Sequence, residues 1–384
     1  MGTQMAALSR ILACFVVALV FATATFTHAR DRWTTGQAKN WQEKTGWLVG
    51  ANFAPAYAIN QIEMWQKETF DPAAIDRELG LAAGLGMNTM RVFLHHLVWE
   101  EDPQGFLNRV DEFLALCHKH NVRPMIVLFD SVWDPHPKTG KQRAPQKGLH
   151  NSGWVQSPGA KDLTDPARHL LLEAYVKTII GHFKDDHRII AWDLWNEPDN
   201  MNDSSYGKNK LKQEPPNKQE LTTALLKKSY GWARSVNPSQ PLTSGLWIKG
   251  RAVDPKKHIP IEKIQLEESD IISYHSYGNL DEMKEWVAAM KKYDRPLLCT
   301  EYMARPVGST FDPILGYLKS ENIAAYNWGF VAGKSNTIYP WDSWQKPYDA
   351  EPPRWFHDIF REDGTPYDEK EVAYIRSITG KTAR

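Results

Sequence analysis

The chain has 384 residues, of which 42% are hydrophobic and 24% charged, so it can bury a full core and is neither disordered nor fibrous in composition. Its 46 basic and 46 acidic side chains cancel, which removes any electrostatic reason to expect nucleic acid or an anionic membrane as a partner. A neutral balance suits a neutral ligand such as a sugar.

The first 29 residues have the pattern of a secretory signal peptide. Arg10 precedes an apolar run over residues 11–21, and small residues follow up to Ala29. The run is shorter than the roughly 20 residues that span a bilayer, which favours a cleaved leader over a retained N-terminal anchor. We therefore expect an exported protein, periplasmic or extracellular, with a mature domain over residues 30–384 and no stable membrane insertion.

Two of the three cysteines, Cys117 and Cys299, lie beyond the predicted leader in apolar periodic segments. This placement is more typical of buried small hydrophobic residues than of a disulfide, although an exported chain makes a bridge chemically possible. No Cys/His spacing indicates a zinc site.

After the leader, short apolar runs alternate with amphipathic segments about eight times. The runs are typical of buried parallel strands, and the 3.6-residue period between them predicts helices. The expected strands cover residues 47–53, 89–94, 124–129, 189–195, 241–246, 271–275, 297–300 and 324–328. The expected helices cover residues 71–86, 107–120, 165–183, 221–236, 283–290 and 314–318. Asp-Pro pairs at 71–72 and 165–166 are expected to open two of these helices.

Eight strands with helical crossovers favour an α/β fold of the (β/α)8 TIM-barrel type, in a single domain, over an open sheet. Polar, Pro/Gly-rich stretches follow three of the strands, at residues 131–162, 199–217 and 331–353. In a barrel these long βα loops lie on the C-terminal rim, where such loops build the substrate site. No linker divides the chain in two.

Two glutamates follow the predicted strands four and seven. Residues 192–195 run into Asn196 and Glu197 and are stopped by a proline, and residues 297–300 run into Glu301. Both carboxylates are expected at the mouth of the barrel, where two carboxyls about 5 to 5.5 Å apart can cleave a glycoside with retention. Ionising one raises the pKa of the other, so one can remain the acid while the other is the anionic nucleophile.

These glutamates, together with Arg91, His275-x-Tyr277 and Trp328 near other strand ends, resemble the clan A glycoside hydrolases, most closely the family 5 cellulases and mannanases. The resemblance covers most of the mature chain, and similar signals in the β-galactosidase and β-glucuronidase group leave the family within the clan open. It implies an O-glycosyl hydrolase, cellulase-, mannanase- or xylanase-like, that acts on a carbohydrate without a cofactor or metal ion. We expect it to be a monomer.

The resemblance implies the role of each motif residue. Glu197 would be the acid/base and Glu301 the nucleophile of a double displacement on β-linked poly- or oligosaccharides. Asn196 would bind the sugar 2-hydroxyl, and Arg91 would orient the nucleophile and keep it ionised.

Further aromatic and polar residues have expected roles around this pair. His275 and Tyr277 match the family's His-x-Tyr, with Tyr277 placed to hydrogen-bond the nucleophile. Trp328 would be the aromatic platform under the sugar at the point of cleavage. Other tryptophans in the rim loops are candidates for stacking on sugar rings: Trp133, Trp154, Trp247, Trp341 and Trp344.

Two departures from the family pattern leave the subfamily open. Asp130 and Ser131 follow strand three where a His-Asn type pair is frequent, and the pair His95-His96 after strand two has no counterpart in the signature. These histidines, with His136 and His275, would suit a metal hydrolase on the same fold, but no His-x-His follows strand one. A carbohydrate-binding protein without catalysis and a transglycosylase with the same residues are the remaining alternatives.

Overall fold

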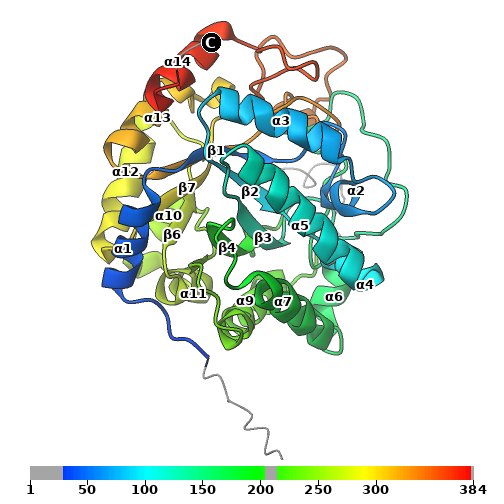
Figure 1. The fold of residues 1–384 in the computed structure, drawn as a ribbon, viewed down its shortest axis with the longest axis vertical. Helices are drawn as coiled ribbons and strands as arrows, with labels where there is room; N and C mark the ends of the chain where they lie inside the picture. The colour runs from blue at the N-terminus through cyan, green and yellow to red at the C-terminus, as the bar shows by residue number, and fades with distance from the viewer. Residues whose placement is uncertain (1–28, 204–213, 382–384) are drawn as a thin grey trace, which may run out of the picture.

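The computed structural model describes residues 29–203 and 214–381, and Figure 1 shows a barrel of strands inside a ring of helices. The strands are β1 (Val49–Phe53), β2 (Thr89–Phe93), β3 (Met125–Asp130), β4 (Ala191–Asn196), β5 (Leu242–Thr243), β6 (Ile272–His275), β7 (Leu297–Tyr302) and β8 (Ala324–Asn327). They form one sheet in the order β5-β4-β3-β2-β1-β8-β7-β6. A parallel bridge between Leu246 and Tyr274 closes the seam between β5 and β6. The predicted (β/α)8 barrel is confirmed.

The eight predicted strands are all present, and β5 differs most from its prediction. Only Leu242 and Thr243 pair with β4. Leu246 pairs with β6 instead, because its N–H donates a hydrogen bond to the carbonyl of Ser273 at 2.9 Å. Gly245 lies between these two pairings, where a Cβ atom would come 3.2 Å from Nε2 of His275. The chain therefore changes partner within the predicted strand.

Helices connect the strands and cover the outside of the barrel (Figure 1). They are α1 (Thr35–Thr45), α2 (Gln61–Trp65), α3 (Pro72–Gly84), α4 (His96–Glu101), α5 (Pro103–Lys119), α6 (Ala160–Thr164), α7 (His169–Phe183), α9 (Lys218–Ser235), α10 (Lys249–Ala252), α11 (Pro260–Glu268), α12 (Leu280–Met290), α13 (Phe311–Ser320) and α14 (Glu369–Thr379). The six predicted helices correspond to α3, α5, α7, α9, α12 and α13.

One of the two predicted helix starts is wrong. Asp71 caps α3 as expected, accepting hydrogen bonds from the N–H groups of Ala73 and Ala74. Asp165 and the proline after it form a turn instead, because the Asp165 carboxylate accepts a hydrogen bond from the N–H of Ala167, and α7 begins only at His169. The helices α1, α11 and α14 were not predicted from the sequence.

The segment before α1 seals the N-terminal end of the barrel. Nη2 of Arg30 lies 2.6 Å from Oδ2 of Asp270, and the N–H of Trp33 donates to Oδ1 of the same carboxylate at 2.7 Å. Asp270 precedes β6, is fully buried and also accepts from the N–H of Leu242 in β5 at 2.9 Å. One carboxylate thus joins the N-terminal segment to both strands of the β5–β6 seam.

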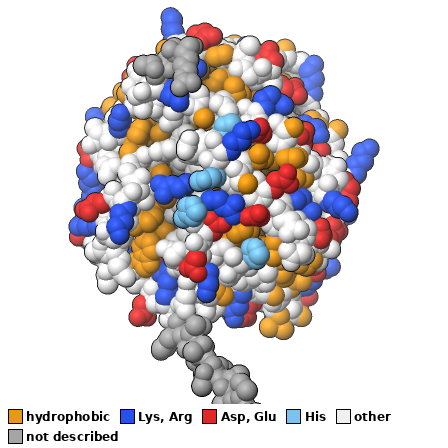
Figure 2. All heavy atoms as spheres, in the orientation of Figure 1, with side chains coloured by type: hydrophobic (Ala, Val, Ile, Leu, Met, Phe, Trp, Pro, Cys, Tyr) orange, Lys and Arg blue, Asp and Glu red, His pale blue; other side chains and the backbone are white. Residues whose placement is uncertain are grey.

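The cysteines and the surface charges agree with what the sequence predicts. Cys117 and Cys299 are buried and free, as predicted. Basic and acidic side chains are interspersed over the face seen in Figure 2, in keeping with the neutral charge balance. Among the described residues, no helix has both the length and the apolar character needed to cross a bilayer. The predicted leader falls almost entirely on residues 1–28, outside the described part, as do residues 204–213 of one rim loop.

Candidate active site

A cavity of about 720 Å³ lies at the C-terminal ends of the strands. Both predicted glutamates line it, and each of the three predicted rim loops contributes to its wall, as with Trp133, Asn200 and Trp341. The long loops therefore surround one pocket that contains the carboxylate pair.

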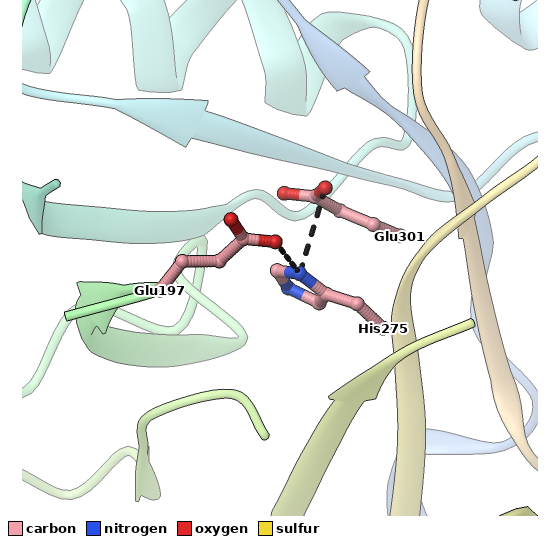
Figure 3. A group of neighbouring side chains, drawn as sticks. All are labelled: Glu197, His275 and Glu301. Atoms are coloured by element: carbon pink, nitrogen blue, oxygen red, sulfur yellow. Dashed lines mark hydrogen bonds and ion pairs between the residues drawn. The ribbon is translucent and has the colours of Figure 1, made fainter. Parts of the chain in front are cut away.

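Glu197 directly follows β4 with a left-handed backbone, at φ 43°, a conformation that non-glycine residues adopt mainly where the fold imposes it. Its side chain is 8% exposed and is held at both oxygens. Nδ1 of His275 lies 2.7 Å from Oε1, and Nδ2 of Asn200 donates to Oε2 at 2.6 Å. In Figure 3 the carboxyl of Glu197 points toward His275 and Glu301.

Glu301 lies within β7 and is 5% exposed. Nη1 of Arg91 donates to its Oε1 at 3.0 Å, and the hydroxyl of Tyr277 donates to its Oε2 at 2.7 Å. Nδ1 of His275 also lies 3.5 Å from that Oε2, between the two glutamates (Figure 3). One oxygen of Glu197 and one of Glu301 lie within 4.8 Å of each other.

The surroundings of the two carboxyls separate their roles. Burial raises the pKa of Glu197 to about 7, against the lowering effects of the Asn200 hydrogen bond and the charge of Arg91. Burial also raises the pKa of Glu301, and the charge of Glu197 adds to the rise, whereas His275, Arg91 and Tyr277 lower it. Burial is thus a larger cause than the mutual repulsion that the sequence suggested. Glu301 alone is bonded to a permanent cation, so it is the group that stays ionised.

His275 is neutral at pH 7, because burial lowers its pKa to about 4. Its Nε2 is buried and has no hydrogen-bond partner among the described residues. An unpaired N–H costs more than an unpaired acceptor, so the proton belongs on Nδ1, where it can be donated to Glu197. His275 therefore orients the acid without neutralising it.

Arg91 is the centre of a buried network below the pocket floor. Besides Glu301, it donates to Oδ2 of Asp193 at 3.0 and 2.8 Å, to Oδ1 of Asn52 at 2.8 Å and to Oδ1 of Asn196 at 2.7 Å. Asp193 and Asn52 were not predicted from the sequence as site residues. The available signal was a polar residue within an otherwise apolar buried strand, which needs a partner inside the barrel.

Asp130, one of the departures from the family pattern, orients Asn196. Its Oδ1 accepts from Nδ2 of Asn196 at 2.9 Å, and its Oδ2 accepts from Trp154 at 2.6 Å and Gln61 at 3.1 Å. Burial raises the pKa of Asp130 to about 6. The amide nitrogen of Asn196 donates to Asp130 and its amide oxygen accepts from Arg91, so the amide has a single orientation. One N–H of the amide remains available to bind a ligand.

The tryptophans divide into those that face the pocket and those that support it. The pocket is lined by Trp133, Trp247, Trp328 and Trp341. Trp247 is fixed by donating to Oδ1 of Asp199 at 2.7 Å. Trp344 stacks behind Trp133 with ring centroids 5.5 Å apart, and Trp154 is buried against Asp130. Of the five further candidates for sugar stacking, three therefore reach the main pocket.

The histidines that suggested a metal hydrolase do not assemble into one site. His95 and His96 are buried and bind the loop after β3, through the carbonyl of Gln156 and the carboxylate of Asp162, while His136 is exposed. Within the described ranges, metal-ligand spacing occurs only for Glu197, His275 and Glu301. The guanidinium of Arg91 already supplies a positive charge 3.0 Å from this last carboxylate.

The chain matches a family described as "Cellulase (glycosyl hydrolase family 5)" over residues 41–361. A mannan endo-1,4-beta-mannosidase F of Aspergillus clavatus is 23% identical over 159 residues, which are 41% of this chain and 30% of that protein. This chain thus matches less than a third of that relative's length.

Solved structures share the fold at low identity. An exo-beta-1,4-mannosidase from Opitutaceae bacterium strain TAV5 superposes with a TM-score of 0.57 at 20% identity, covering 88% of this chain and 60% of that one. A beta-1,4-D-mannanase from Cryptopygus antarcticus superposes with a TM-score of 0.54 at 12% identity, covering 87% of this chain and 90% of that one.

Proposed function

The chain belongs to glycosyl hydrolase family 5, and we propose that it is a retaining glycosidase that cleaves β-linked oligo- or polysaccharides of the mannan or cellulose type. The observation that carries this proposal is the approach of Glu197 and Glu301 to within 4.8 Å at the pocket mouth. Retaining cleavage needs carboxyls about 5 to 5.5 Å apart, whereas inversion needs about 6.5 to 9.5 Å to admit a water molecule.

The first step forms a glycosyl-enzyme. Glu301 attacks the anomeric carbon and forms the covalent ester, while Glu197 gives its proton to the departing glycosidic oxygen. The pKa of Glu197 near 7 keeps a proton available at neutral pH, and the Arg91 and Tyr277 contacts keep the Glu301 oxygens charged and aimed.

The second step hydrolyses the glycosyl-enzyme and regenerates the free enzyme. Glu197, now a carboxylate, removes a proton from a water molecule that attacks the same carbon, and Glu301 leaves. Asn196 is suited to hydrogen-bond the sugar 2-hydroxyl throughout, since Asp130 and Arg91 fix its amide. Trp328 offers an apolar face to the ring.

The substrate proposal rests on the relatives and on the pocket walls. The two comparison structures are named for β-1,4-mannoside cleavage, as is the fungal relative. Among the described residues that line the pocket there is no lysine or arginine, which favours a neutral sugar over a uronic acid. A transglycosylase would use the same residues with a sugar in place of the water, and a binding protein would use the tryptophans without turnover.

We also propose that residues 1–29 are a signal peptide and that the mature protein acts outside the cytoplasm as a monomer. The leader pattern supports export, and the contacts of Arg30 with Asp270 show that the fold engages the chain from its first residue after the proposed cleavage point.

Product stereochemistry tests the proposal directly. Purified protein is incubated with β-glucan, mannan, xylan and galactan and with aryl β-glycosides, and the first sugar released is followed by proton NMR. We expect the β-anomer first. An α-anomer would contradict the retaining mechanism, binding without turnover across the panel would favour a binding protein, and chain lengthening in place of release would favour a transglycosylase.

A further inference from the structure

We infer that this site, if it is the glycosidase proposed above, accommodates a single sugar on the non-reducing side of the scissile bond and therefore removes monosaccharides from chain ends. The inference rests on a wall formed where the loop after β3 meets the loop after β8. We call this wall the β3–β8 junction and define it as residues 146–151 together with residues 335–348.

The chemistry determines how a sugar lies in the pocket. Glu301 must reach the anomeric carbon and Glu197 the oxygen that leaves it, so the leaving group extends along the Glu197 wall. Trp247 belongs to that wall, because its indole N–H is bonded to Asp199, two residues after Glu197. The hydroxyl opposite the anomeric carbon must then point away from the Glu197 wall, and we place it on the side of the pocket that Asn151 lines.

The β3–β8 junction closes the pocket on that side. The N–H of Asn151 donates to the carbonyl of Ser335 at 2.9 Å, and the N–H of Tyr348 donates to the carbonyl of Gly148 at 3.1 Å. Between these two bonds, His150 donates its N–H to Oγ of Ser343 at 3.0 Å. Because β1 and β2 lie between β3 and β8 in the sheet, the junction crosses above the ends of these two strands.

Side chains reinforce the junction. The indole N–H of Trp344 donates to the carbonyl of His150 at 2.8 Å, and its ring stacks on Trp133. Nδ1 of His150 lies 2.8 Å from the carbonyl of Tyr339. Gly148 has φ 74° and approaches so closely that a Cβ atom there would lie 1.9 Å from the carbonyl oxygen of Tyr348. The two loops are therefore held together by hydrogen bonds and ring stacking along this side of the pocket.

The loop after β1 is hydrogen-bonded to the same two loops, at residues next to the β3–β8 junction. The N–H of Lys334 donates to the carbonyl of Ala56 at 2.9 Å, and Nδ2 of Asn60 donates to the carbonyl of Gly153 at 2.8 Å. Three loops thus form one wall. A polysaccharide that continued past the first sugar would have to separate them.

A smaller hollow of about 310 Å³ behind Trp328 does not continue the binding site as a groove. It shares Trp328 and Asn151 with the main pocket, but most of its lining is interior, including Phe53, Phe93 and Phe330, each no more than 2% exposed. Polar side chains also line the hollow, but only about 20 Å³ of it admits the centre of a water molecule, so it has no room for a second sugar ring.

The test compares a free and a blocked chain end. A panel of aryl β-glycosides first identifies the sugar that the protein accepts. The matching β-linked tetrasaccharide, labelled at its reducing end, is then offered with its terminal 4-hydroxyl either free or carried in a 4,6-benzylidene acetal. We expect the free form to shorten one sugar at a time from the non-reducing end, and the blocked form to persist.

The outcomes separate this inference from the proposed function. A mixture of labelled fragments from the first minutes, or cleavage of the blocked chain, would overturn the exo assignment and leave the glycosidase proposal standing. Failure to hydrolyse every glycoside and polysaccharide offered would overturn the proposed function, and the exo assignment with it.

Two variants test whether the β3–β8 junction is the cause. Trp344→Ala removes the stack on Trp133 and the bond to His150, and we expect it to begin cutting the blocked tetrasaccharide. Trp247→Ala, on the leaving-group wall, is the matched control and should leave that substrate uncut. A folded Trp344→Ala protein, judged by its circular dichroism and its aryl glycoside activity, that still rejects the blocked substrate would refute the junction as the barrier.

Discussion

His275 and Glu197 are joined by a 2.7 Å contact between Nδ1 and Oε1, in which the histidine is neutral at pH 7. Glu197 is thus hydrogen-bonded to the uncharged side chains of His275 and Asn200, and burial raises its pKa to about 7 against the lowering effect of the Arg91 and Lys218 charges. The opposite carboxylate, Glu301, has Arg91 at 3.0 Å. This difference in partners supports the proposed roles of Glu197 as the acid and Glu301 as the nucleophile.

The first prediction concerns pH. Hydrolysis needs a protonated Glu197, so kcat/KM should fall as the pH rises through about 7, the pKa of this group in the free protein. In Glu197→Gln, a dinitrophenyl glycoside, whose leaving group needs no proton, should be cleaved to the glycosyl-enzyme without this alkaline limb. An alkaline limb that survives in the variant would assign the titration to another group.

The second prediction concerns the nucleophile. Glu301→Ala should lower kcat by about 10⁴-fold or more, because no covalent intermediate can form. Added sodium azide should restore turnover by occupying the vacated space and should yield the glycosyl azide of inverted configuration. Glu285→Ala, at an exposed position on α12, is the control and should keep full activity. Full activity in Glu301→Ala would refute the assignment.

The third prediction concerns the buried network. Arg91→Ala leaves Asp193 and Glu301 as buried carboxylates without a cation, which should lower the free energy of unfolding by about 3–5 kcal/mol and kcat/KM by about 10²-fold or more. Lys119→Ala breaks only the exposed pair with Asp76 and should cost about 1 kcal/mol or less. Equal urea midpoints for the two variants would contradict this account.

The fourth prediction concerns Asp130, which acts through Asn196. Asp130→Asn replaces one of two accepting oxygens with an N–H₂ group, so the side chain can no longer accept from Asn196 and Trp154 at once, and kcat/KM should fall by about 10- to 100-fold on normal substrates. On an aryl 2-deoxyglycoside, which has no 2-hydroxyl for Asn196 to bind, wild type and variant should differ much less. Asp134→Asn, in the loop that follows β3, serves as control. An equal loss on both substrates would point to a purely structural role.

The fifth prediction concerns metal ions. The ligand-like group of Glu197, His275 and Glu301 is already satisfied by Asn200, Arg91 and Tyr277, so dialysis against EDTA should leave the rate of hydrolysis unchanged. Rates before and after dialysis, with metal content measured in parallel, check this. A loss of activity on dialysis that added zinc restores would contradict the proposed glycosidase mechanism.

The strands were predictable because each is a short, mostly apolar and fully buried run, and the glutamates because each follows the apolar part of such a run. The polar residues inside strands, Asn52 and Asp193, were overlooked since neither stands at a strand end, and only the closed barrel brings them to Arg91. Asp130 was noticed as a departure, but its bond to Asn196 depends on the neighbouring positions of β3 and β4.

The rim loops were located by composition, but their mutual contacts were not predictable. Trp344 and Trp133 are more than two hundred residues apart in the sequence, and no sequence pattern predicts that their rings stack. Likewise Asp165 has the sequence of a helix cap and instead forms a turn, because its local hydrogen bond to Ala167 competes with the helix start.

The Arg30–Asp270 pair has a consequence for the order in which the protein is assembled. The two residues are 240 positions apart, and their contact secures the β5–β6 seam. Closing so long a loop costs entropy that is repaid only when the surrounding contacts form. The segment around Arg30 can therefore take its final position only after residue 270 has been synthesised, so the β5–β6 seam is completed late in the synthesis of the chain.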